Sequence, residues 1–284
     1  MEEAERTARS LWSAIEPVHA VTYFAPQARA AFEAAGLRGF WRGYFAGRAA
    51  PLGEVGPGPV TAAFFGFAPA MVARAVPGVW AAAAPGRVLE ARRTGAGAAL
   101  EGLLSGYGPQ VEEAADLLVP VAGELDCAGR VLAAANQALP VPRTAVDRLW
   151  HAATVLREHR GDGHVAALVA AGLDGCEALV LRAGIDLPRA ELQPYRGWSD
   201  DRWQAARDRL AARGWLTSGG TATPEGRRAH RAVEEATDRA AARPWQALGP
   251  TEADRLGRVL APLARACAAV LRFPNPMGLP APAA

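Results

Sequence analysis

One short polar run carries most of the acid, base and imidazole chemistry of this sequence. It reads Leu156-Arg157-Glu158-His159-Arg160-Gly161-Asp162-Gly163-His164 and interrupts an otherwise apolar helical region. Carboxylates and imidazoles at this density are suited to acid–base chemistry or to metal binding. The two glycines predict a break in the helix at which the backbone approaches a ligand.

Three interpretations of this run are open. In the first, His159, His164 and Asp162 form a metal site, although the spacing differs from H-E-x-x-H and no third histidine lies close by. In the second, the run is a structural corner between helices. In the third, which we adopt, the run is one wall of a small-molecule pocket, and we expect no metal and no cofactor. The pocket residues are then Glu158, His159, Asp162 and His164.

A second group of candidate binding residues lies nearer the N-terminus. His19 and Tyr23 lie in one helical stretch, and the run FWRGYFAGR follows at residues 40–48. Arg42 and Arg48 are suited to holding an anionic group through paired hydrogen bonds, with Tyr44 as an apolar wall. The alternative is a helix crossing that the aromatic rings simply pack.

Further along the chain, the pattern predicts a helix followed by a small hairpin. Apolar residues recur at three- and four-residue spacing over 200–213, Ser199 is suited to cap that helix, and Gly214 to end it. Short strands are predicted at 215–217 and 221–223, joined through a Gly-Gly turn. Another helix should begin after them, because a threonine and a proline follow each other there.

Helix, hairpin and long helix occur in this order in winged helices. The stretch from about Leu187 to Leu263 resembles the winged helix-turn-helix of MarR-type regulators, in which a glycine ends the recognition helix and a T-P-x-G-R-like run follows the wing. The whole chain also resembles an actinobacterial family of this length that is labelled helix-turn-helix by its C-terminal half.

The resemblance implies contact with double-stranded DNA through the recognition helix and the segment after the wing. The candidate side chains are Arg202, Gln204, Arg207, Arg209 and Arg227. Three aspartates on the same helix nearly cancel its positive charge, so little net positive charge is left to bind phosphates. The alternative is therefore a solvated amphipathic helix in a retained scaffold.

Three separated matches suggest that the chain is a tandem duplication. The sequence Arg-Thr-Ala followed by Leu-Trp occurs at residues 6–12 and again at 143–150. The run Ala-Ala-Gly-Leu recurs at 34–37 and 170–173, and Gly-Pro followed by Leu and Pro recurs in the last part of each half. We therefore predict two MarR-like units, 1–138 and 139–284, that form a pseudo-dimer with a wing in the second unit only.

Composition limits the chemistry that this chain can perform. All 31 basic residues are arginine and the net charge is +2, so lysine-dependent phosphate loops and Schiff-base chemistry are excluded. Three scattered cysteines have no metal spacing. The N-terminus is acidic and the apolar stretch 59–85 is interrupted, which favours a cytoplasmic protein without a membrane span.

Two functions from different classes follow. The first is a ligand-responsive, MarR-like DNA-binding regulator with a pocket for an anionic or aromatic small molecule between the two copies. The second is a winged-helix scaffold that acts as an enzyme or small-molecule binding protein of specialised metabolism without DNA binding. A module that only binds a partner protein is a third.

Overall fold

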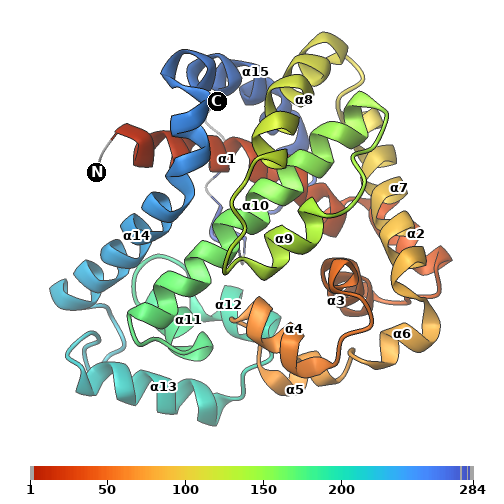
Figure 1. The fold of residues 1–284 in the computed structure, drawn as a ribbon. Coiled ribbons are helices and arrows are strands. Elements are labelled where there is room, and N and C mark those ends of the chain that lie inside the picture. Colours follow the sequence, from red (N-terminus) through yellow and green to blue (C-terminus); the bar gives the residue numbers. More distant parts are fainter. Residues whose placement is uncertain (1–2, 276, 280, 282–284) are drawn as a thin grey trace.

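The computed structural model describes residues 3–275, 277–279 and 281 and is built from helices joined by short connections (Figure 1). In the first half these are α1 (Glu3–Phe24), α2 (Pro26–Ala34), α3 (Phe40–Ala49), η1 (Ala50–Leu52), α4 (Pro57–Phe64), α5 (Pro69–Ala73), α6 (Gly78–Ala82), α7 (Pro85–Leu103), α8 (Gly108–Gly123) and α9 (Val131–Gln137). In the second half they are α10 (Ala145–Ala170), α11 (Gly175–Ala183), α12 (Arg189–Arg196), α13 (Asp200–Ala212), α14 (Pro224–Leu248) and α15 (Pro250–Ala268). The prediction of a mainly α fold is confirmed.

The largest hydrophobic core lies where α1 and α10 meet α8, α14 and α15. Leu11 and Ile15 of α1, Leu149 of α10, and Leu256 and Leu260 of α15 are almost fully buried in it. Each such side chain contributes about 1.5–3 kcal/mol relative to exposure. The core therefore draws on both sides of residue 138, and α10 runs through the middle of the molecule (Figure 1). The division into units 1–138 and 139–284 stays a prediction.

The polar run does not break its helix, which corrects the expectation placed on its two glycines. Helix α10 continues from Ala145 to Ala170 without interruption. A glycine inside a helix costs about 1 kcal/mol relative to alanine, and the packing of a largely buried helix outweighs that cost. Gly163 also serves close approach, because an added Cβ would lie 2.6 Å from Nη1 of Arg130.

Helices α11, α12 and α13 pack around a separate small core. Leu181, Leu192, Trp203 and Leu210 are buried there, and α13 lies along the outer edge of the molecule (Figure 1). The predicted cap is confirmed, since the Ser199 side chain accepts a hydrogen bond from the third residue of α13. The predicted helix ends are also confirmed: a left-handed glycine, at φ 70°, follows α13, and a threonine caps α14.

The predicted wing is wrong, and with it the expected architecture of two winged-helix units. Among the described residues there is no strand, and only an isolated bridge joins Leu216 to Ala222. On either side of this bridge Thr217 N–H donates to Thr221 O at 2.9 Å and Thr223 N–H to Trp215 O at 3.0 Å, whereas Ala222 N–H donates to Gly184 O at 2.9 Å, outside the connection. Two-stranded hairpins are marginal even at greater length. The segment 215–223 is therefore a short loop closed by one bridge, without the two strands of a wing.

The interrupted apolar stretch 59–85, whose pattern indicates two buried helices, contains most of α4, all of α5 and α6, and the start of α7. In the described part of the chain no single helix is long and apolar enough to cross a membrane. Helices α10 and α11 taken together pass that test by length and composition, but they meet at 92° and most of that stretch is buried in the protein.

Candidate functional site

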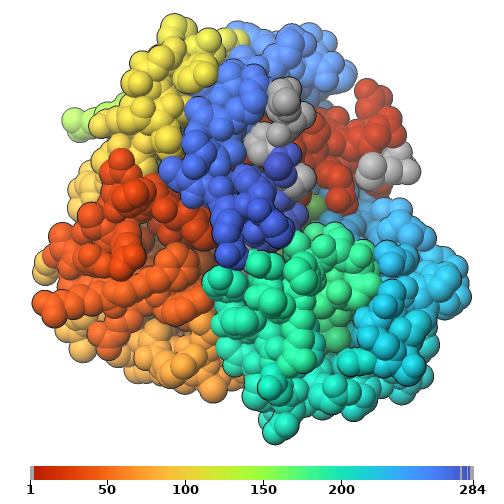
Figure 2. Space-filling view, turned by 180° about the vertical axis from the view of Figure 1, so that it is seen from behind, coloured from red at the N-terminus to blue at the C-terminus, as the bar shows by residue number. Residues whose placement is uncertain are grey.

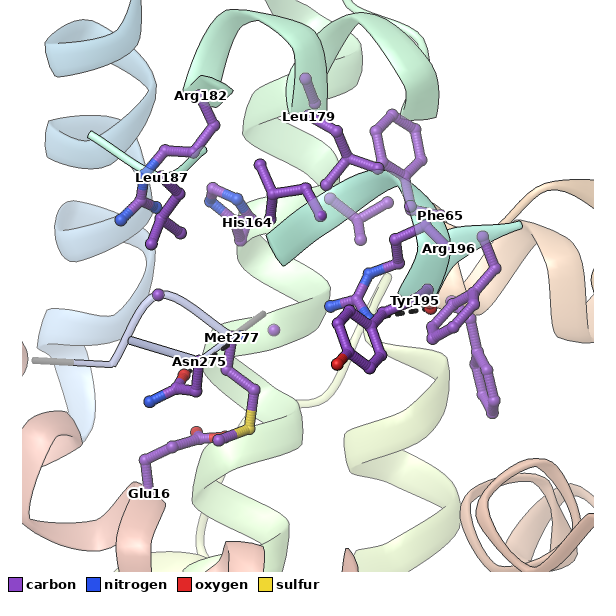
Figure 3. A pocket seen from close by; sticks show the side chains of 18 of the residues that line it. Glu16, Phe65, His164, Leu179, Arg182, Leu187, Tyr195, Arg196, Asn275 and Met277 are labelled. Atoms are coloured by element: carbon purple, nitrogen blue, oxygen red, sulfur yellow. Dashed lines mark hydrogen bonds between the residues drawn. The ribbon is translucent and has the colours of Figure 1, made fainter. Parts of the chain in front are cut away.

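A cavity of about 970 Å³ lies between the first half of the chain and the helices α10, α11, α12 and α14 (Figure 3). Its wall includes Tyr44 of α3, His164 of α10, Leu179 of α11 and Tyr195 of α12. The segment after α15 closes another side, where Met277 points inward. Figure 2 shows this segment, in dark blue, lying between the N-terminal helices and the region of α11 to α13. Cavities of this size hold drug-sized ligands.

Aromatic rings form one end of the cavity. The ring of Tyr44 lies 4.9 Å from that of Tyr23 and 5.5 Å from that of Phe67, measured between centroids. Phe40 and Trp41 continue the same wall from α3. Rings at these separations attract each other and present apolar faces. This end is suited to an apolar or aromatic ligand.

A buried ion pair lies behind this wall. Arg48 donates from Nε to Oε1 of Glu158 at 2.9 Å and from Nη2 to Oε2 at 3.0 Å. Arg157 donates to the same Oε2 at 2.8 Å and to Glu16 at 3.2 Å. Burial alone would raise the pKa of Glu158, but the charges of Arg157 and Arg48 lower it well below its usual range. Glu158 is therefore ionised and fully engaged.

His164 reaches the cavity from α10 (Figure 3). Its Nδ1 lies 2.9 Å from the hydroxyl oxygen of Thr237 on α14. Burial lowers the pKa of His164 to about 4, so the imidazole is neutral at pH 7. One turn earlier, Arg160 binds Asp238 at 2.9 Å and lies over the ring of Trp12 at 4.2 Å.

His19 and Tyr23 form a hydrogen-bonded chain beside the aromatic end. Nδ1 of His19 lies 3.0 Å from the hydroxyl of Thr154, and Nε2 lies 3.0 Å from the hydroxyl of Tyr23. His19 is 2 % exposed and Tyr23 is its link to the cavity. Burial lowers the pKa of His19 well below its usual value and raises that of Tyr23.

The structure gathers some predicted pocket residues and separates others. Tyr23, Tyr44, Arg48 and His164 line the cavity, whereas His19, Arg42, Glu158, His159 and Asp162 do not. Arg42 is exposed on α3. The carbonyl of His159 accepts a bond from Arg130, and burial lowers the pKa of the His159 imidazole to about 4. Asp162 accepts two backbone N–H groups in the first turn of α9, both at 2.9 Å, and burial raises its pKa to about 6.

The exposed face of α13 presents the predicted DNA contacts unequally. Arg202 is exposed, and its guanidinium has no partner among the described residues. Gln204 donates to Asp208 at 2.8 Å on the same helix. Arg207 donates to the carbonyl of Ser218 in the turn after α13. Arg202 is thus the cation of α13 that is readiest to meet a phosphate.

Two further predicted contacts differ in their surroundings. Arg209 donates to Asp174 at 2.6 Å and to Glu177 at 2.7 Å, so α13 is tied to the start of α11. Both carboxylates also form the capping box of α11. Arg227 is half-buried near the start of α14. Arg209 would have to leave a carboxylate pair before it could bind a phosphate.

A docked turn, which the sequence did not reveal, joins α12 and α13 to the first half. Nε1 of Trp198 donates to the carbonyl of Gly66 at 2.9 Å, and Ala68 N–H donates to the carbonyl of Arg196 at 2.9 Å. These residues are some 130 positions apart, and no local pattern links them. The guanidinium of Arg196 lies 4.6 Å from the centroid of the Phe67 ring and lines the cavity.

Strain and close packing mark the same contact. Phe65 is the one described non-glycine residue with positive φ, at 44°, and backbone in that region is uncommon for a bulky side chain. Its carbonyl lies against Gly175, where an added Cβ would come within 2.1 Å of the oxygen. The glycine at the start of α11 is therefore required by the contact.

The described residues contain no group of three His, Cys, Asp or Glu side chains that could hold a metal ion. Comparison with known proteins gives a match to the model of a helix-turn-helix family over residues 8–274. That match contains nothing specific to MarR-type regulators. No curated protein and no solved structure matches the chain.

Proposed function

The chain belongs to this helix-turn-helix family, and we propose that it is a DNA-binding regulator whose DNA affinity responds to a small molecule in the cavity. The observation that carries the proposal is that α12, the first helix of the exposed α12–α13 pair, also forms a wall of the cavity. Such a regulator acts in the cytoplasm, which is the location that the sequence predicts.

Exposure and position support α13 as the helix that meets DNA. The helix lies on the outer edge of the molecule (Figure 1), and its apolar side, with Trp203 and Leu210, is buried against α11 and α12. The opposite side carries Arg202 and Gln204 in exposed positions. Arginine and glutamine are side chains that contact phosphates and base edges in the major groove.

The docked turn supports a route from the cavity to that helix. Tyr195 and Arg196 of α12 line the cavity, and Trp198, two residues later, anchors the turn to Gly66. A ligand that separates the walls would therefore move the turn that sets the direction of α13. A ligand shifts such an equilibrium only by its difference in affinity for the two arrangements.

A DNA titration at two salt concentrations tests the proposal. We expect binding to genomic fragments at about 50 mM salt and much weaker binding at about 200 mM, because phosphate contacts release counterions. Arg202→Ala should weaken binding and lower the salt slope by about 1. Arg38→Ala, at another exposed arginine, is the matched control and should change neither. Absence of binding at the lower salt concentration would refute the proposal.

A second candidate function is an enzyme or small-molecule binding protein without DNA binding. One argument for it is that Arg209 is paired with carboxylates, which leaves fewer positive charges on α13 to bind phosphates. Another is that a neutral His164 lines a large cavity. A neutral imidazole can act as a general base. Retention of small molecules from a cell extract by a protein that binds no DNA at low salt would favour this candidate.

A further inference from the structure

Hydrogen bonding fixes which ring nitrogen of His164 carries the proton. The hydroxyl of Thr237 lies 2.8 Å from the carbonyl oxygen of Val233, which can only accept. The single hydroxyl proton of Thr237 is therefore directed at that carbonyl, as is common for threonine in helices. The 2.9 Å contact between Thr237 and Nδ1 of His164 must then be donated by the ring. Nδ1 carries the proton and Nε2 is an acceptor.

Nε2 of His164 is an acceptor that faces the cavity. In the part of the chain that the structure describes, no protein group bonds to this nitrogen, and the residue lines the cavity. The titratable groups that act on its imidazole are Glu234 and His230 of α14, Arg160 of α10 and Arg182 of α11. Water in the cavity can donate to this nitrogen, and a ligand that displaces the water without offering a donor leaves the acceptor unpaired at a cost of about 1–3 kcal/mol. The position calls for a donor.

A second histidine, His19, has the same arrangement, and there the hydroxyl group of Tyr23 occupies the position next to Nε2. The hydroxyl of Thr154 lies 2.8 Å from the carbonyl of Trp150, and Nδ1 of His19 lies 3.0 Å from that hydroxyl. By the same reasoning Nδ1 of His19 donates, and its Nε2 accepts the hydroxyl proton of Tyr23 at 3.0 Å. The same threonine–histidine arrangement thus occurs twice, closed by a hydroxyl group in one case and open to the cavity in the other.

The charges of the cavity wall are already matched to each other. Six of its arginines have carboxylate partners among the described residues: Arg9, Arg48, Arg157, Arg160, Arg182 and Arg272. The pairs of Arg48, Arg157 and Arg160 are buried, and removing one partner of a buried pair costs several kcal/mol, so an anionic ligand gains little by displacing their carboxylates. The guanidinium of Arg196 lies over the ring of Phe67 and donates to the carbonyl of Tyr195. Because this cation also lines the cavity, a negatively charged probe is included in the test.

We propose that the cavity selects an uncharged, largely apolar molecule that donates a hydroxyl proton to Nε2 of His164. This rests on the ligand cavity of the proposed function and names the class of its ligand. The aromatic end around Tyr44 holds the apolar body, and the hydroxyl occupies the place that Tyr23 takes beside His19.

Three probes of similar shape test the ligand class by isothermal titration on the full chain. They are naphthol, its methyl ether and naphthoate. Naphthol should bind at least about tenfold more tightly than the methyl ether, which cannot donate a proton and leaves the acceptor unpaired. Naphthoate should also bind more weakly than naphthol. Equal binding of naphthol and the ether, tighter binding of naphthoate, or no saturable binding of naphthol overturns the inference.

Two variants test whether His164 produces that preference. His164→Asn keeps an amide donor near Thr237 but has no group where Nε2 lies, so the tenfold preference should fall to about onefold. Thr237→Val removes the acceptor that holds the proton on Nδ1. The preference for naphthol over its methyl ether should therefore fall, although His164 is still present. His159→Asn, the same change on the same helix but away from the cavity, is the control and should keep the wild-type ratio.

The ring proton itself gives a readout that is independent of any ligand. Proton–nitrogen correlation spectra of the imidazoles, assigned through His164→Asn, should show His164 protonated on Nδ1. Protonation on Nε2 overturns the inference. DNA binding by the ligand-free protein is measured separately, so failure of the ligand class leaves that result standing and failure of DNA binding leaves the probe ratios standing.

Discussion

Replacing Glu158 with glutamine should destabilise the protein strongly, although the change is nearly isosteric. Glu158 accepts three hydrogen bonds from Arg48 and Arg157 at 2.8–3.0 Å, and its side chain is 2 % exposed. Glutamine keeps one acceptor oxygen and turns an N–H group towards a guanidinium. Arg48 would then lose its carboxylate partner, and Arg157 would keep only Glu16.

The expected loss follows from the burial of the pair. Truncating one partner of a buried ion pair costs about 3–5 kcal/mol, because the other charge stays desolvated. With a urea slope of about 3 kcal/mol/M, the midpoint should fall by roughly 1–2 M. Arg48→Met combined with Glu158→Leu removes both charges and leaves Arg157 with Glu16. This double variant should lose less stability than Glu158→Gln alone.

The assay is urea unfolding followed by circular dichroism, and it is repeated at several pH values. The folded pKa of Glu158 is depressed, so its contribution is fully present above the unfolded value of 4.5 and is lost as the pH falls. The difference between wild type and Glu158→Gln should therefore shrink below about pH 4.5. A loss under about 1 kcal/mol at pH 7, in the range of surface pairs, would refute the buried pair.

Three further outcomes are expected. Burial lowers the pKa values of His151, His159 and His164 to about 4. The unfolded chain therefore binds more protons than the folded one between pH 4 and 6.5, and the free energy of unfolding should rise with pH across that window. His159→Asn should reduce that rise in urea titrations at several pH values, while Asp162, with its pKa raised to about 6, acts in the opposite sense. Gly175→Ala should lower the melting temperature and weaken DNA binding, because the added Cβ would meet the carbonyl of Phe65. Gly102→Ala is the control: the space around Gly102 is open, so the change should stabilise the protein by about 0.5–1 kcal/mol. Trp198→Phe should cost about 1 kcal/mol in urea unfolding by removing the bond to Gly66, and an unchanged midpoint would argue against the docked turn.

Local signals were sufficient where a structure depends on neighbouring residues. The cap at Ser199, the glycine after α13 and the proline at the start of α14 all lie within one turn of the backbone groups that they affect, and each was predicted correctly. The hairpin was wrong for a related reason. A Gly-Gly turn between β-formers indicates a hairpin, but the pairing ends after one bridge, and Ala222 N–H bonds to the carbonyl of Gly184 outside the segment.

The pocket prediction depended on directions that a sequence pattern does not fix. His159 and His164 belong to one run, yet α10 continues through it and turns them to different sides: His164 lines the cavity, whereas His159 lies beside Ala241 and Trp245 of α14. Arg48 and Glu158 were both chosen as binding residues, and the fold pairs them with each other across 110 positions.

The sequence by itself determined a helical protein without lysine chemistry, the helix α13 with its cap and its end before the long α14, and the residue types that a binding site would use. These features follow from composition and from contacts between residues a few positions apart. The tertiary structure alone decided where the cavity lies, which charges neutralise each other and how α12 and α13 are anchored, because these contacts join residues more than 100 positions apart. It also decided that one histidine, His164, turns an open acceptor towards the cavity, since that depends on a threonine of another helix.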